Sequence, residues 1–230
     1  MPHHLFRHLL AAALMVGSHL ITAAPAIGTL ETVAELPIRP GNVSATANAR
    51  VFATVHPLDV PSGLQLIEIT GPASYRPWPS ADLQSDANTR GDSRIDAPLG
   101  ITQDGRGRLW ITDMGLNIGK TRLWGFDIAT GKLARRIDLP GDVAPKDSFI
   151  QDLVVDAERG WIYLADINHP ALLAVRIEDG KVRRFQGHAS LQAEEGAEMR
   201  VGGQPTFFGG KPAKGGVNPL GLSVDGETLF

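Results

Sequence analysis

The 230-residue sequence contains no cysteine. This absence excludes a disulfide scaffold, a thiolate-ligated zinc site, a cysteine nucleophile and a lipid anchor attached through cysteine. Positive charge is not in excess either, because 22 Lys and Arg residues stand against 25 Asp and Glu. The formal net charge of −3 provides no basic surface for nucleic acid. The hydrophobic fraction of 43% is too high for a disordered tail, so the composition is that of a globular protein with its own core.

Standard catalytic motifs are also missing. The sequence has no serine in a nucleophile-elbow pattern, no phosphate-binding glycine motif and no HExxH pair. These absences argue against a standard hydrolase, kinase or metalloprotease. A site assembled from distant segments leaves no such motif, so the sequence leaves open whether the protein is an enzyme.

Residues 1–26 have the pattern of a signal peptide. Arg7 supplies a positive start, an apolar stretch runs from Leu9 to Ala24, and Ala24-Pro25-Ala26 offers a small-x-small cleavage site. The apolar stretch is short for a membrane span of ~20 residues, although an uncleaved anchor is the alternative. We expect a secreted or periplasmic bacterial protein without membrane attachment after cleavage, because an exported protein without disulfides fits a bacterial periplasm or surface best. Cleavage leaves three histidines, His56, His169 and His188.

An internal repeat organises the rest of the chain. LGITQDGRGRLWITD, residues 99–113, is echoed by IQDLVVDAERGWIYLAD, residues 150–166, so that Trp110 corresponds to Tyr163 and Asp113 to Asp166. Each copy continues into two further predicted strands, and a third copy, NPLGLSVDGETLF, opens at Asn218. Asp-Gly and similar turns separate the short strands, and no long helix-periodic segment is present. Recurrence of the two aspartates at equivalent turns favours a structural role for them.

Four short strands per unit, with a period near fifty residues, are typical of β-propeller blades. The sequence therefore predicts an all-β fold with about three blades and the start of a fourth. We expect residues 27–48 to be an N-terminal connector and residues 49–230 a partial β-propeller, in which residues 49–79 form a degenerate first blade. Closed propellers have ~4 to 8 blades, so we expect the sequence to be truncated at the C-terminus relative to a complete ring. Two such chains completing one ring is the alternative.

Four sequence blocks resemble a known family. The blocks PLGITQDGRGRLWITDMG, RLWGFDIATGKLARRIDLP, SFIQDLVVDAERGWIYLADI and NPLGLSVDG occur in an order similar to that of the major royal jelly protein and insect yellow family. Bacterial members of the family are commonly labelled dopachrome-tautomerase-related. The resemblance extends over about residues 49–230, and its most specific parts are RLWITDMG and SFIQDLVVD.

The resemblance implies a secreted six-bladed β-propeller with a small-molecule pocket at one mouth of its central channel. Some members of the family bind biogenic amines, and some insect members are linked to dopachrome conversion. This sequence departs from the family in lacking its usual disulfide cysteines and in ending before the last blades.

A second resemblance is to the SMP-30/gluconolactonase propellers. Asn218 lies seven residues before Asp225, a spacing similar to that of the blade opening whose asparagine ligates a divalent metal in those enzymes. Gln151, five residues before Asp156, falls where such enzymes carry another polar channel residue. The partner carboxylates expected of such a metal site are not evident in the sequence.

Polar residues at blade openings are the best ligand candidates, because the innermost strand of each blade lines the channel of a propeller. On this basis we single out Asp96, Gln151, Asp152 and Asn218. The alternative is that these side chains cap turns. Asn168 and His169, which follow the turn at Asp166, are further candidates, and His169 has the chemistry of an acid or base near neutral pH.

Residues 189–217 form a long glycine-rich connection, and connections of this length are often functional lids. Phe207 and Phe208 are suited to stack on an aromatic ligand, while their alternative role is to plug the underside of a blade. The paired arginines at 135–136 and 183–184 fall on outer strands, where we expect them to remain solvated and to protect the sheet edges.

Three functions remain open on the sequence alone. The first is a yellow-like protein that binds a small aromatic or amine-type molecule at the channel mouth without a cofactor, with or without dopachrome-tautomerase-like isomerase activity. The second is a lactonase-like enzyme in which Asn218 helps to hold Ca²⁺ or Zn²⁺. The third is a non-catalytic propeller that binds another protein. The expected partner is a small molecule, with no nucleic acid and no membrane.

Overall fold

The computed structural model describes residues 28–58, 63–208 and 210–230. The expected signal peptide and its cleavage site lie outside the described residues. The chain divides into two compact units, residues 1–32 and 33–230, and the second unit holds all the strands. In the described part of the first unit, residues 28–32, there is no helix or strand. A search of the described segments finds no helix with the length and apolarity required to traverse a bilayer.

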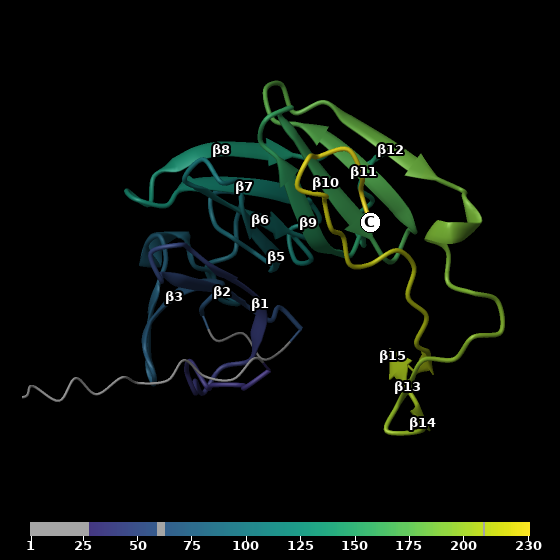
Figure 1. Ribbon diagram of the computed structural model, residues 1–230, viewed down its shortest axis with the longest axis horizontal. Helices are drawn as coiled ribbons and strands as arrows, with labels where there is room; N and C mark the ends of the chain where they lie inside the picture. Colours follow the sequence, from purple (N-terminus) through teal and green to yellow (C-terminus); the bar gives the residue numbers. More distant parts are fainter. Residues whose placement is uncertain (1–27, 59–62, 209) are drawn as a thin grey trace, which may run out of the picture. The chain divides into compact units, whose positions relative to one another are not determined.

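Three four-stranded antiparallel sheets make up most of the second unit (Figure 1). The first contains β1 (Pro40–Ala45), β2 (Val51–Val55), β3 (Leu66–Gly71) and β4 (Ser74–Pro77). The second contains β5 (Pro98–Gln103), β6 (Arg108–Asp113), β7 (Arg122–Asp127) and β8 (Leu133–Asp138). The third contains β9 (Ile150–Asp156), β10 (Trp161–Asp166), β11 (Ala171–Arg176) and β12 (Val182–Gln186).

Shorter elements connect and follow the sheets. A 3₁₀ turn, η1 (Ala81–Leu83), lies between the first two sheets, and η2 (Ala189–Leu191) follows the third. Two small hairpins then pair β13 (Arg200–Val201) with β14 (Gln204–Pro205) and β15 (Phe207–Phe208) with β16 (Lys211–Pro212). A bridge between Leu222 and Leu229 opens a further hairpin at the end of the chain.

The sheets are consecutive blades of a partial β-propeller, as predicted. Within each sheet the strands follow one another in chain order, and the first strands, β1, β5 and β9, are neighbours from one sheet to the next. The hairpin of residues 218–230 repeats the opening of the second blade and is the start of a fourth. The sheets do not close into a ring within the described residues.

The repeat aligns the second and third sheets in register. Trp110 on β6 is paired with Thr102 and Gly125, while Tyr163 on β10 is paired with Val154 and Ala174. Both aromatic side chains therefore occupy the same position of the second strand in their blades. Trp110 is fully buried in the core between the second and third sheets, whereas Tyr163 is half-buried on the side of the third sheet that no described sheet covers.

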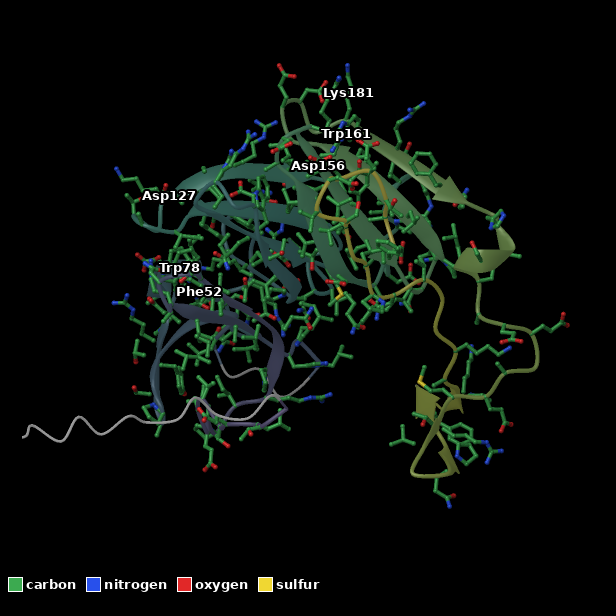
Figure 2. All side chains as sticks on the ribbon, in the orientation of Figure 1. Phe52, Trp78, Asp127, Asp156, Trp161 and Lys181 are labelled. Carbon is green, nitrogen blue, oxygen red and sulfur yellow. The ribbon has the colours of Figure 1, made fainter. Side chains whose placement is uncertain are left out.

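Two hydrophobic cores join the sheets. The core between the first and second sheets is rich in aromatic rings, and Figure 2 shows Phe52 and Trp78 beside each other, with ring centroids 4.7 Å apart. The core between the second and third sheets contains Trp110, Leu123, Leu153 and Leu164 among other buried residues. Each sheet thus buries one face against the next, which is how neighbouring blades stabilise one another.

The N-terminal boundary of the first blade differs from the prediction. The segment 27–48, expected to be a connector, contains β1, so the first sheet begins at Pro40 instead of residue 49. The sequence of β1, PGNVSA, is polar and only half-buried, and therefore carries no hydrophobic alternation from which a strand could be recognised.

The recurring aspartates have the structural role predicted for them. The Asp113 carboxylate is fully buried, pairs with Arg122 at 2.6 Å and accepts a hydrogen bond from the Trp124 indole N–H. It also accepts the backbone N–H groups of Ala97 and Gly115. The third sheet repeats the arrangement. There the buried Asp166 carboxylate accepts the Ser148 hydroxyl and the Arg184 guanidinium, and it also accepts the backbone N–H of Phe149.

The expectation that the outer-strand arginines are solvated was wrong for two of them. The Arg184 side chain is only 12% exposed, because it reaches inward to Asp166. The Arg136 side chain is 21% exposed, lies 5.0 Å from the Trp124 ring centre and pairs with Asp92 and Asp138. Both arginines therefore tie loops to their sheets, in addition to covering an edge.

Candidate functional site at the opening end of the third sheet

We call the end of the sheets at which β1, β5 and β9 begin the opening end. At the opening end of the third sheet lie six polar residues that define the opening-end cluster: Asp147, Gln151, Asp152, Asn168, His169 and Asn218. The connection before β9, the start of β9, the β10–β11 turn and the segment after β16 contribute them. Five of the six lie within residues 147–169, close to the Asp166 turn.

In the first and second blades a threonine side chain forms the link to the next blade, and in the third blade Asp152 forms this link. Thr54 donates its hydroxyl to the carbonyl of Leu99 at 2.7 Å, and Thr112 donates to the carbonyl of Ile150 at 3.0 Å. Each hydroxyl thus ties its own blade to the next. The equivalent residue of the third blade is Ala165, which has no hydroxyl, and Asp152 is paired with it across the strands.

The half-buried Asp152 carboxylate makes the corresponding link. One oxygen accepts the backbone N–H of Leu220 at 2.9 Å, and the other accepts that of Leu153 at 2.9 Å. Each carboxylate oxygen has room for a further donor, because an ionised carboxylate offers about four acceptor positions. Asp152 therefore positions the fourth blade while remaining able to bind an external cation or donor.

Gln151 precedes Asp152 on β9, and its side chain makes no hydrogen bond to another described residue. Its backbone carbonyl accepts the Asn42 side-chain amide of the first sheet at 3.2 Å. The close approach requires Gly100 in between, because a Cβ there would lie 3.0 Å from the same carbonyl oxygen. The half-buried Gln151 side-chain amide itself has no hydrogen-bond partner in the described part of the chain, which leaves a donor and an acceptor for a ligand.

The side chains of His169 and Asp147 form a hydrogen bond at the same end. The His169 Nε2 atom lies 2.7 Å from Asp147 Oδ1, and the Asn168 side-chain amide donates to the Asp147 carbonyl at 2.9 Å. The hydrogen bond with His169 lowers the pKa of the Asp147 carboxyl, so this group is ionised at neutral pH. Asp147 was not among the predicted residues, because a contact across 22 positions leaves no mark in the sequence.

The segment 216–220 contacts both the β10–β11 turn, which carries His169, and Asp152 at the start of β9. Gly216 packs so closely on Pro170 that a Cβ would lie 2.8 Å from its ring, and Leu220 is bonded to Asp152. Asn218 lies between these two anchors, is exposed, and precedes a cis bond to Pro219. The structure thereby brings Asn218 into the neighbourhood of Asp152 and of the turn that carries His169.

Two of the predicted site residues lie elsewhere. Asp96, in the connection before β5, is buried and accepts the backbone N–H groups of Asn117 and Ile118, with Arg90 at 3.9 Å, so it fixes a loop. Phe207 lies on β15, 58% exposed, and no described contact joins it to the opening-end cluster.

A cavity that the sequence did not reveal lies at the other end of the sheets. Its volume is about 480 Å³, and its walls are the β5–β6 turn, the β9–β10 turn and the turn of the last hairpin. Each of these turns carries an aspartate at the equivalent position: Asp104, Asp156 and Asp225. This recurrence in the sequence could have predicted that the three turns lie at the same end of the sheets. Each aspartate accepts backbone N–H groups of its own turn. Figure 2 shows Asp156 near Trp161, at the start of β10.

Metal binding finds no support in the side-chain arrangement. Among the described residues, no group of three or more His, Asp or Glu side chains is placed to hold a metal ion.

Comparison with known proteins places the resemblance in the second and third sheets. Residues 98–206 match the family model described as Major royal jelly protein. This segment is slightly less than half of the chain and shorter than the predicted span of residues 49–230. It contains Gln151, Asp152, Asn168 and His169, but it ends before Asn218.

Similar curated proteins are insect yellow proteins. Protein yellow of Drosophila melanogaster is 33% identical over 135 residues, which cover 53% of this chain and 24% of that protein. Protein yellow of Drosophila yakuba is 32% identical over 135 residues, with the same two shares. The chain thus spans about a quarter of the length of the curated relatives it matches.

Similar solved structures have low sequence identity. The extracellular domain of a putative one-component system from B. thetaiotaomicron has a TM-score of 0.44 and 13% identity, over 82% of this chain and 21% of that chain. Apo AztD from Citrobacter koseri has a TM-score of 0.37 and 12% identity, over 72% of this chain and 39% of that chain. The resemblance recognised in the sequence blocks is confirmed by the family model and the curated relatives: the chain resembles the major royal jelly protein and yellow family.

Proposed function

We propose that the protein is an exported, yellow-like binding protein that holds a small aromatic amine at the opening-end cluster. The observation that carries the proposal is the half-buried Asp152 carboxylate beside the unpartnered Gln151 amide, on the innermost strand of the third blade. Export is proposed from the leader-like pattern of residues 1–26 and the lack of cysteine.

The negative charge of the cluster favours a ligand that carries a positively charged group. Asp152 and Asp147 supply carboxylates, and the Arg184 guanidinium behind them is occupied by Asp166. A primary ammonium group placed at Asp152 gains charge-assisted hydrogen bonds, and partial burial makes these stronger than at a fully solvated carboxylate. The Gln151 amide supplies a donor and an acceptor for ring hydroxyl groups. A phenolic amine such as dopamine carries both kinds of group.

We expect Asp152→Asn to weaken dopamine binding about tenfold, because a charge-assisted hydrogen bond contributes roughly 1.5 kcal/mol or more. The asparagine keeps a carbonyl oxygen for the Leu220 N–H, so the hairpin of residues 218–230 stays in place. Isothermal titration calorimetry with dopamine measures the change. The matched control is Asp225→Asn, which removes an exposed carboxylate at the opposite end and leaves the affinity unchanged. Wild-type protein that does not bind dopamine, or equal affinities for both variants, would contradict the proposal.

A further inference from the structure

We propose that β12, the outer strand of the third sheet, pairs in antiparallel orientation with β12 of a second copy of this chain. β12 is last in the order of its sheet, so it has a neighbouring strand on one side only (Figure 1). Gln151 and Asp152 lie on β9, at the opposite edge of the same sheet. The pairing therefore leaves these two residues uncovered, and the proposal does not depend on the proposed function.

The outer strands of the other two sheets are interrupted, whereas β12 is not. β4 contains Pro77, and its pairing with β3 shifts register between Ile69 and Gly71. The pairing of β8 with β7 shifts between Gly125 and Phe126. Bulges and prolines are devices that prevent an edge strand from pairing with another chain. β12 pairs with β11 continuously, without a proline or a shift, and so lacks both devices.

The backbone groups of β12 that point outward follow from its ladder with β11. The Arg176 N–H donates to the Lys181 carbonyl, so these two residues form a hydrogen-bonded pair. Hydrogen-bonded and non-hydrogen-bonded pairs alternate along an antiparallel ladder. In the continuous register of β12, the N–H and C=O groups of Val182, Arg184 and Gln186 therefore point away from the sheet. Within the described part of the chain these groups have no hydrogen-bond partner.

The strand is self-complementary when two copies run antiparallel about a twofold axis at Arg184. Val182 of one copy then lies opposite Gln186 of the second copy, and Arg184 lies opposite itself. Outward-facing residues thus meet outward-facing residues, and each such pair exchanges both of its backbone hydrogen bonds. The two third sheets become one continuous sheet across the axis.

The side chains on the open face of the sheet favour this register. It sets Arg183 of one copy opposite Phe185 of the second copy, and the twofold axis repeats the contact. Phe185 is 50% exposed, and the exposed Arg183 guanidinium has no ion-pair partner among the described residues. A guanidinium beside an aromatic ring is a favourable cation–π contact. A register that sets Arg183 opposite itself is disfavoured, because like charges directly opposite destabilise a strand pair.

The position of Arg184 at the axis is compatible with the pairing. Its guanidinium donates to the buried Asp166 carboxylate and to the backbone carbonyls of Val143 and His169. The side chain is only 12% exposed. Its charge is therefore balanced within its own blade, and the two arginines at the axis do not meet as solvated cations.

Sedimentation velocity of the full chain over a concentration series tests the pairing. We expect a reversible equilibrium between monomer and dimer. Gln186→Pro removes an outward-facing N–H and should weaken dimerisation about tenfold, because the twofold axis removes the lost hydrogen bond at two places. The matched control, Gln186→Ala, loses the same exposed side chain but keeps the N–H, and it should dimerise within about twofold of wild type.

Two results would overturn the proposal. One is a wild-type chain that stays monomeric up to about 0.3 mM, a concentration that populates even a weak complex. The other is a dimer that Gln186→Pro forms as readily as Gln186→Ala, with both variants at the thermal midpoint of wild type.

The lack of cysteine allows a second test, because any disulfide must then join introduced residues. A mixture of Arg183→Cys and Phe185→Cys chains should form crosslinked dimers on oxidation, since the Cβ atoms of opposite residues in paired antiparallel strands lie ~4.5–5.5 Å apart. Each variant alone should crosslink far less, because its cysteine lies diagonal to that of its own copy. A mixture that crosslinks no better than either variant alone contradicts the pairing, including the case in which Gln186→Pro fails to fold.

Discussion

Replacing Asp113 by alanine is expected to destabilise the protein by about 3–5 kcal/mol, because it removes one partner of a fully buried ion pair. The Arg122 guanidinium would be left without its counter-charge. Its Nε atom already has no hydrogen-bond partner in the described structure, so little local compensation is available. The Trp124 indole N–H and the backbone N–H groups of Ala97 and Gly115 would lose their acceptor as well.

Urea unfolding followed by tryptophan fluorescence measures this change. Asp142→Asn, which alters an exposed carboxylate in the connection after β8, is the control and should change stability by less than about 0.5 kcal/mol. If Asp113→Ala does not fold, Asp113→Asn gives the same comparison in a milder form. A loss below about 1 kcal/mol for either variant would show that Asp113 is not the centre of the second blade's network.

Trp110→Ala is expected to cost about 3–5 kcal/mol, and the equivalent Tyr163→Ala only about 1–2 kcal/mol. The two residues occupy the same register position, but Trp110 is fully buried between two sheets and Tyr163 is half-buried. The Trp110 ring lies over Gly125, where a Cβ would be 2.9 Å from it. Truncating the ring therefore opens a cavity between blades.

The unfolding midpoints of the two variants provide the measurement. The ratio of the two losses in unfolding free energy is more informative than either loss alone, because it depends on which face of each blade is covered by a neighbouring sheet. Equal losses would indicate that Tyr163 is packed as tightly as Trp110, which is contrary to the arrangement of sheets described above.

Much of the fold could be predicted from the sequence, because the second and third blades carry strong signals. Their Asp-Gly-type turns, alternating apolar strands and recurring Trp/Tyr and Asp positions define strand number and register. The first blade was harder, since β1 is polar and its pairing with β2 is decided by tertiary contacts. Arg184 was misread for a related reason: a charged residue on an outer strand looks solvated until its buried partner, Asp166, is known.

The candidate site could be predicted only in part. The sequence named five candidates, because blade openings and turns can be located in it: Gln151, Asp152, Asn168, His169 and Asn218. Asp96 belongs to the same pattern but is used to hold a loop, and only the structure shows which role applies. Asp147 and the replacement of the threonine link by Asp152 depend on contacts between segments. Neither the role of Asp147 nor that of Asp152 can be predicted from the sequence of a single segment.

The central claim is that the ligand binds at the opening end of the third sheet. The most direct test is a two-dimensional ¹⁵N–¹H NMR titration of the full chain with dopamine. We expect the largest amide shift changes at Gln151, Asp152, His169 and the residues around Asn218. Changes centred instead on Asp104, Asp156 and Asp225 would place the ligand in the cavity at the opposite end and contradict the claim.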